Sequence, residues 1–263
     1  KIKYLAVFLV IGILLACSLV RADEEGMEKW QGVQRVEGYA GAKGVFAPSG
    51  TTASVHGHII VYPWMWQTEE GVNLLGVGYK VNYWDSPGGY GQRHLGEVAF
   101  RGYRPWGSFR FSLLGGIQDE KYGSSEPRHT LYGVGGYTSL NHGGLFPKTE
   151  LWAQLLKANG SRGGKTDAII DIGGRQYLVK DAPIKPYIEA NLAIGTPNSY
   201  ASLGVGIGIT DRREIFYLSA GPQFNLKNGG IAPFVNVGIS TSNAVDAAIR
   251  ANAANTVQDT KTP

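Results

Sequence analysis

Hydrophobic residues alternate with small or polar ones along most of this chain. The clearest stretch is LGVGIGI, in which Leu203, Val205, Ile207 and Ile209 are separated by single glycines. Successive side chains of a β-strand point to opposite faces of the sheet. The alternation therefore predicts strands that have one apolar face and one face of small or polar residues.

Turn residues divide this alternation into twelve segments. Pro48-Ser49-Gly50 and Asn228-Gly229-Gly230 are typical of the breaks, because proline, glycine and asparagine favour tight turns. Most segments exceed the usual strand length of about five or six residues, and about 9–11 tilted residues span a bilayer. The expected strands are 33–46, 54–66, 72–84, 93–104, 108–118, 128–140, 149–158, 166–180, 184–195, 200–210, 214–226 and 231–242.

The second face of these strands indicates their surroundings. It carries mostly Gly, Ser, Thr and Asn with scattered charges, whereas an exposed face of a soluble sandwich normally carries many Lys and Glu. Small polar residues suit the inside of a membrane barrel, and aliphatic residues suit its lipid face. Backbone groups in lipid have to pair, so the sheet has to close. We predict an all-β fold over residues 33–242, a single closed antiparallel transmembrane β-barrel of about 12 strands in up-and-down order. A secreted soluble β-barrel is the alternative.

The ends of the strands add two expectations. If the N-terminal side is periplasmic, the connections on the far side are mostly longer, as in outer-membrane barrels. Aromatic residues near strand ends are expected to form girdles at the membrane interfaces. These residues are Trp64, Trp66, Trp84, Tyr103, Trp106, Tyr200 and Phe224.

The two ends of the chain differ from the barrel. Residues 1–22 have the layout of a secretory signal peptide, with Lys1, an uncharged apolar run and small residues before a cleavage point after Ala22. The residues before Cys17 also resemble a lipobox, so lipidation at Cys17 is the alternative to cleavage after Ala22. We expect 23–32 to be a short periplasmic segment and 243–263 to be a polar tail, partly helical or disordered.

Composition supports the strand pattern and excludes one class of partner. The chain has 38 glycines and 14 tyrosines but only 17% charged residues, which suits strands and tight turns. Its net charge is +4, and removal of the signal peptide would leave 22 basic residues against 21 acidic ones. No basic patch indicates nucleic-acid binding.

The alternation along each strand (its parity) predicts which side chains point into the interior of the barrel, its lumen. Their mixed charges either line a narrow polar pore or form a paired network that plugs one, and the sequence leaves both open. The predicted lumen-lining residues are Lys80, Asn82, Glu97, Arg101, Arg110, Asp171, Arg175, Glu189, Asn191, Gly204, Gly206 and Gly208.

Two groups of residues could carry chemistry. His56 and His58 share one face of a strand and are weak candidates for a metal site, but no third ligand is evident, so polar lumen residues are the simpler interpretation. Ser139 and His142 lie three residues apart at a strand end, so they need not share a face, and turn chemistry is the simpler interpretation. We therefore expect no catalytic residues, no metal and no cofactor.

These features together resemble the small outer-membrane β-barrels of Gram-negative bacteria, over Val33 to Ser242. Thr149–Trp152, Leu218–Phe224 and a last strand without a terminal aromatic are also similar to the BcsS-type barrel of cellulose-producing bacteria, although Gln223 replaces an expected acidic residue. That second resemblance implies a role in exopolysaccharide secretion.

The sequence thus predicts a non-enzymatic outer-membrane barrel that acts as a small pore for polar solutes. The alternatives are an accessory or structural envelope barrel linked to exopolysaccharide secretion, a lipid-modifying barrel enzyme and a soluble secreted barrel. Expected partners are outer-membrane lipid and lipopolysaccharide, and a polysaccharide or a periplasmic partner bound through the tail. The solute and the oligomeric state are not readable from the sequence.

Overall fold

A computed structural model describes residues 36–121, 123–124, 128–142, 146–160, 166–180, 182–195, 200–227 and 229–240. The expected signal peptide, the segment 23–32 and the tail 243–263 lie outside these residues. Within them, no helix is long and apolar enough to cross a membrane. The strands are β1 (Val36–Ala47), β2 (Gly50–Thr68), β3 (Gly71–Ser86), β4 (Gly89–Arg104), β5 (Gly107–Lys121), β6 (Arg128–Asn141), β7 (Lys148–Gly160), β8 (Thr166–Tyr177), β9 (Ile184–Gly195), β10 (Tyr200–Asp211), β11 (Phe216–Asn225) and β12 (Ile231–Ser240).

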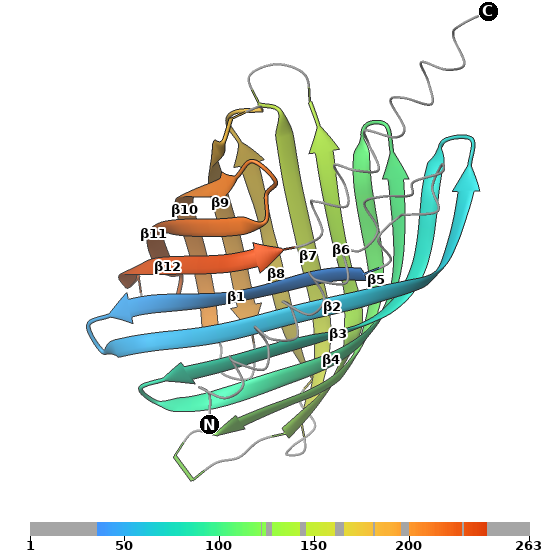
Figure 1. The fold of residues 1–263 in the computed structure, drawn as a ribbon. Coiled ribbons are helices and arrows are strands. Elements are labelled where there is room, and N and C mark those ends of the chain that lie inside the picture. Colours follow the sequence, from blue (N-terminus) through green and yellow to red (C-terminus); the bar gives the residue numbers. More distant parts are fainter. Residues whose placement is uncertain are drawn as a thin grey trace, which may run out of the picture.

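The twelve strands form one closed antiparallel barrel (Figure 1). Each strand pairs with its neighbours in sequence, and β1 pairs with β12 from Tyr39–Ser240 to Val45–Phe234. The predicted all-β fold, the strand number and the up-and-down order are confirmed. Val36 and Ser240 lie at the same end of the barrel, which we call the terminal end; the opposite end is the far end.

The outer surface of the barrel is apolar. The most exposed large hydrophobic side chains include Ile207, Phe216 and Ile231, of which 74%, 63% and 62% are exposed. Their neighbours in sequence, such as Tyr217 and Ala232, are buried inside. A continuous surface of this kind suits lipid, since soluble monomers rarely expose apolar patches beyond a few hundred Å².

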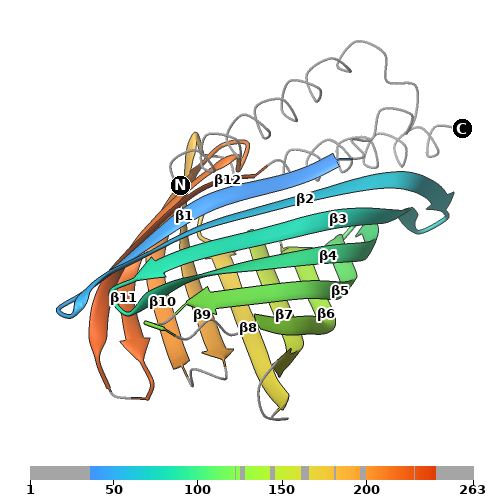
Figure 2. The same cartoon turned by 90° about the horizontal axis from the view of Figure 1, so that it is seen from below.

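The predicted difference in loop length between the two ends is wrong. Only residues 87–88 join β3 to β4 at the far end, and only 69–70 join β2 to β3 at the terminal end. At both ends of the barrel, the connections between strands are two to six residues long. Residues 85–92 separate two of the expected strands in the sequence, but in the structure the ladder continues through them up to the turn at 87–88, with Asp85 opposite Tyr90. Both views show how these long strands slope around the barrel wall (Figure 2).

A β-bulge in β2 changes which side chains face outward. Val61 pairs with Val77 and Trp64 with Leu75, so Tyr62 and Pro63 together oppose one residue of β3. Proline has no N–H to donate to the ladder, and a bulge accommodates this loss. The extra residue reverses the parity of the strand. Tyr62 still points inward, as Ile60 does, and is buried, whereas the reversal places Trp64 and Trp66 on the outer surface, where they lie exposed.

The aromatic residues form a belt at the terminal end of β2–β5, but not with all the predicted members. The rings of Trp66, Phe100, Phe109 and Trp106 follow one another at centroid distances of 5.9, 5.9 and 6.3 Å. Tyr103 was assigned to this belt wrongly. It shares the inward parity of the buried Arg101 on the same strand, and its hydroxyl donates a hydrogen bond to Glu37.

Inside the barrel, aromatic rings fill the space above two of the three glycines of LGVGIGI. A Cβ atom at Gly208 would lie 2.3 Å from the ring of Tyr187, and one at Gly206 would lie 2.8 Å from the ring of Phe234. At Gly204 the nearest atom would be 3.5 Å away, which is ordinary van der Waals contact. The three glycines therefore have different roles, although the sequence pattern treats them alike.

This difference predicts unequal costs for two identical substitutions. Gly208→Ala should lower the free energy of unfolding by about 1–3 kcal/mol, because the added methyl group overlaps the Tyr187 ring and the Leu218 carbonyl. Gly204→Ala, in the same strand, is the matched control and should change stability by less than about 0.5 kcal/mol. Urea unfolding of the barrel in lipid vesicles measures both. An equal decrease in the free energy of unfolding in the two variants would contradict this account of the packing.

Candidate functional site

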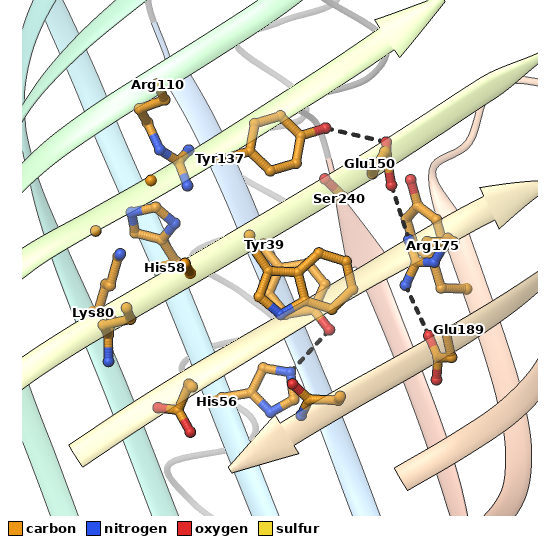
Figure 3. Close-up of a pocket in the computed structure, with 18 of the residues that line it drawn as sticks. Tyr39, His56, His58, Lys80, Arg110, Tyr137, Glu150, Arg175, Glu189 and Ser240 are labelled. Carbon is orange, nitrogen blue, oxygen red and sulfur yellow. Dashed lines mark hydrogen bonds and ion pairs between the residues drawn. The ribbon is translucent and has the colours of Figure 1, made fainter. Parts of the chain in front are cut away.

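A polar cavity of about 400 Å³ lies inside the barrel (Figure 3). All twelve strands contribute at least one residue to its wall. Its volume falls at the lower end of the range of about 300–1,000 Å³ that is usual for small-molecule sites. The cavity is therefore the candidate functional site.

The structure places most of the predicted lumen-lining residues on this wall. Glu97 lies just behind the wall and contacts four of its members, and Asn82 lies opposite His56 on the neighbouring strand. Gly206 and Gly208 lie on the inward face under aromatic rings. The residues on the wall itself are Lys80, Arg101, Arg110, Asp171, Arg175, Glu189, Asn191 and Gly204.

The first charged cluster surrounds Glu97 on β4. Its carboxylate lies 2.5 Å from Nε2 of His58 and 3.5 Å from Nζ of Lys80, and it accepts a hydrogen bond from the Ser112 hydroxyl. Glu97 is buried, so these partners replace the water that it loses.

The second charged cluster crosses the lumen. Glu37 on β1 is buried and pairs with Arg101 on β4 and, at 3.0 Å, with Arg110 on β5. Strand β1 is not a neighbour of β4 or β5, so these contacts span the inside of the barrel. They connect strands that are three and four places apart around the barrel, near the terminal end.

The third charged cluster surrounds Arg175 on β8. The guanidinium lies 3.3 Å from both Glu150 and Glu189, and 4.2 Å from the ring centroid of Tyr217 on β11. The hydroxyl of Tyr137 also donates to Glu150, over 3.1 Å. Figure 3 shows these groups as one chain along the wall. Arginine satisfies two carboxylates and an aromatic face at once because its guanidinium is planar and has five donors.

Two further ion pairs join walls that are not neighbours. Lys148 on β7 lies 2.5 Å from Glu214, in the connection between β10 and β11. Arg93 on β4 lies 3.6 Å from Asp171 on β8. The described lumen is therefore not an open cylinder, because side-chain pairs cross it at several levels.

The two histidines do not form a common metal site. Nε2 of His56 lies 2.9 Å from the hydroxyl of Tyr39, and His58 is bound to Glu97. Among the residues that the structure describes, no group of three or more His, Cys, Asp or Glu side chains could hold a metal ion. Both rings act as polar members of the cavity wall.

Ser139 and His142 are not brought together by any hydrogen bond in the described part of the chain. The Ser139 hydroxyl is buried, on an inward-facing position opposite Glu150. His142 is exposed, and its Nε2 lies 2.9 Å from Oγ1 of Thr149. A lipid-modifying enzyme of the serine–histidine type needs a hydrogen bond between nucleophile and base, and these contacts do not supply one.

Sequence reasoning omitted several members of the wall, mainly aromatic ones. They include Tyr39, Tyr137, Trp152 and Phe234. The same parity that identified Arg175 and Glu189 applies to them, but aromatic side chains suit a lipid-facing surface equally well. Only the observed register shows that these rings point inward.

Comparisons with known proteins establish the fold. No protein-family model matches the chain, and no curated protein matches it. Its structure is similar to the beta domain of the Bordetella autotransporter BrkA, with a TM-score of 0.50 and 13% identity over 79% of this chain and 99% of that one.

Two other autotransporter barrels match less closely. The translocator domain of NalP from Neisseria meningitidis gives a TM-score of 0.43 and 10% identity over 90% of this chain and 97% of that one. The transport unit of AIDA-I from Escherichia coli gives 0.41 and 16% over 87% and 97%. The resemblance to the BcsS-type barrel receives no support from these similarities and stays a prediction.

Breaking the lumen-crossing pair should destabilise the barrel. Glu37→Gln keeps the size of the side chain but leaves the charges of Arg101 and Arg110 without this carboxylate, so we expect a loss of about 3–5 kcal/mol. The matched control is Asp119→Asn, which removes a carboxylate from the exposed pair with Arg128 and should have a much smaller effect. Urea unfolding in vesicles measures both variants. A Glu37→Gln variant as stable as the Asp119→Asn variant would contradict the structural role of the buried pair.

Proposed function

We propose that this chain is a non-enzymatic outer-membrane β-barrel that passes small polar solutes through a narrow lumen. The single observation that carries the proposal is the contrast between the two sides of one wall. The outside exposes aliphatic and aromatic side chains, and the inside encloses a cavity with charged and amide groups. A membrane barrel that admits polar solutes needs this combination.

The ion pairs that cross the lumen set the expected size of the solute. Arg93–Asp171, Glu37–Arg101 and Lys148–Glu214 each reduce the free cross-section. A lumen crossed in this way supports selective passage of small molecules and argues against a wide diffusion pore. Solute entry requires that at least some of these pairs open.

The same crossing pairs favour a second candidate, an accessory or structural envelope barrel with a filled lumen. Buried apolar clusters strengthen this alternative, because they occupy further interior space. One cluster, from Leu95 on β4 to Ile169 on β8, lies toward the far end, and another, around Tyr62 and Tyr103, lies toward the terminal end. The exopolysaccharide-linked role predicted from the sequence belongs to this second candidate.

Conductance across planar bilayers separates the two candidates. The purified wild-type barrel should give small discrete openings. The double variant Arg93→Ala/Asp171→Ala should give openings of larger unitary conductance, because it removes both members of one crossing pair and leaves no unpaired charge from that pair.

The matched control for this experiment is Asp119→Ala/Arg128→Ala. Like the test variant, it removes one aspartate and one arginine charge, but from an exposed pair between the adjacent strands β5 and β6. We expect its unitary conductance to equal that of the wild type. If neither the wild type nor the Arg93→Ala/Asp171→Ala variant opens, the channel proposal is rejected and the filled structural barrel is favoured.

A further inference from the structure

Lys43 on β1 is a cation on the cavity wall that forms no ion pair with any described residue. Its partners in register on the two neighbouring strands are Ser54 and Asn236, which carry no charge. Its ammonium group lies 4.7 Å from the ring centroid of Phe234. Glu189, a carboxylate on the same wall, is already bound by Arg175 and Ser219.

The charges around the cavity do not balance. Each of the three carboxylates on the wall is bound by an arginine, since Arg175 holds Glu150 and Glu189, and Arg93 holds Asp171. Among the residues that the structure describes, the wall and its direct ion-pair partners together hold seven Lys or Arg side chains and five carboxylates. These are Lys43, Lys80, Arg93, Arg101, Arg110, Lys148 and Arg175 against Glu37, Glu97, Glu150, Asp171 and Glu189.

The cavity leaves room beside the Lys43 ammonium. A Cβ atom placed on Gly204 of β10 would lie 3.9 Å from Nζ of Lys43, and the real residue has no side chain there. Any larger residue at position 204 would occupy this space. A small group of a solute can therefore approach Lys43 from the lumen.

Neutral polar groups and aromatic rings complete this part of the wall. Gln154, Asn191 and Asn236 present amides, and the amide oxygens of Asn191 and Asn236 have no hydrogen-bond partner among the described residues. Trp152 and Tyr39 add aromatic surface. Small-molecule sites commonly combine aromatic walls with a few convergent polar groups that fix the orientation of the ligand.

We propose that the cavity binds a small carboxylate that carries several hydroxyl groups, with the Lys43 ammonium anchoring the carboxylate and the amides meeting the hydroxyls. Lys43 is the Lys or Arg side chain on the described wall that has no ion pair, so it matches one carboxylate group of a solute. The wall arginines Arg101, Arg110 and Arg175 are already committed to carboxylates, so no free guanidinium is left to bind a phosphate dianion in bidentate fashion. The site rests on the proposed function in one respect, that solutes reach the lumen.

Equilibrium dialysis against the detergent-solubilised full chain tests the site. The probes are gluconate, which is a six-carbon hydroxy-carboxylate, and glucose as its uncharged counterpart. Gluconate should bind at least about tenfold more tightly than glucose, since a charge-assisted contact of ordinary strength corresponds to about this factor. Inorganic phosphate and acetate serve as the third and fourth probes, and both should bind more weakly than gluconate.

Variants assign the binding to Lys43. Lys43→Met should weaken gluconate binding at least about tenfold and leave glucose binding unchanged, whereas Lys43→Arg should restore most of the gluconate affinity. The matched control is Lys157→Met, because Lys157 is exposed on the outer surface of β7, where it lies over the ring of Tyr132. That variant should bind gluconate as the wild type does. Circular dichroism of each variant checks that the barrel has folded.

The outcomes separate this site from the channel function. Equal affinity for gluconate and glucose, or unchanged gluconate binding in Lys43→Met, overturns the site whatever the bilayer records show. Tighter binding of phosphate than of gluconate overturns the choice of a carboxylate. Gluconate binding that depends on Lys43 supports the site even if no channel openings occur, since dialysis in detergent needs no passage across a membrane.

Discussion

Closure of the sheet is the constraint on which the rest of the structure depends. The ladder between β1 and β12 gives every strand two neighbours, so no strand edge is left unpaired along the wall. Once the wall is closed, the side chains of each strand point alternately to the outside and to the inside of the barrel. Ile207 and Phe216 therefore face outward, and Tyr217 and Glu189 face inward, through backbone geometry alone. The apolar exterior and the polar interior are two consequences of one arrangement.

The polar interior creates a second requirement, because charged groups removed from water need partners. Neighbouring strands supply some of them, such as Glu150 and Arg175 on β7 and β8. Others come from strands three or four places away around the barrel, and these pairs narrow the lumen as they satisfy the charges. Glu37 with Arg101 is the clearest example, since both side chains are buried and their strands are not adjacent. Of the two lysines on the described cavity wall, Lys80 is paired with Glu97 and Lys43 has no ion pair, so Lys43 is the place where a solute can supply the missing negative charge.

Much of the fold could be predicted from the sequence, because period-two alternation and turn residues are local signals. They located twelve strands and the inward direction of residues such as Arg110 and Asp171. The parity of Arg101 also determines that Tyr103 points inward, so the assignment of Tyr103 to an interfacial belt neglected a signal that was present. Other features depend on more than local pattern. The bulge at Tyr62 and Pro63 reverses the parity of β2, and the loop-like segment around Pro87 is paired as a hairpin. Contacts across the lumen depend on the register around the whole barrel, which no single segment encodes.

The stretch LGVGIGI shows how this limit affects the site. Its aliphatic residues all face outward, as the alternation predicts, but its glycines are equivalent only in sequence. Gly208 lies under Tyr187 of the neighbouring strand β9, and Gly206 lies under Phe234 of β12, two strands away, so the absence of a side chain at each position makes room for a ring. Gly204 has no such close ring and borders the space beside the Lys43 ammonium. Two of the three glycines thus help to fill the barrel, and the third helps to keep a cavity open. The distinction arises from which side chains lie on β1, β9 and β12, and it determines where a solute can be held.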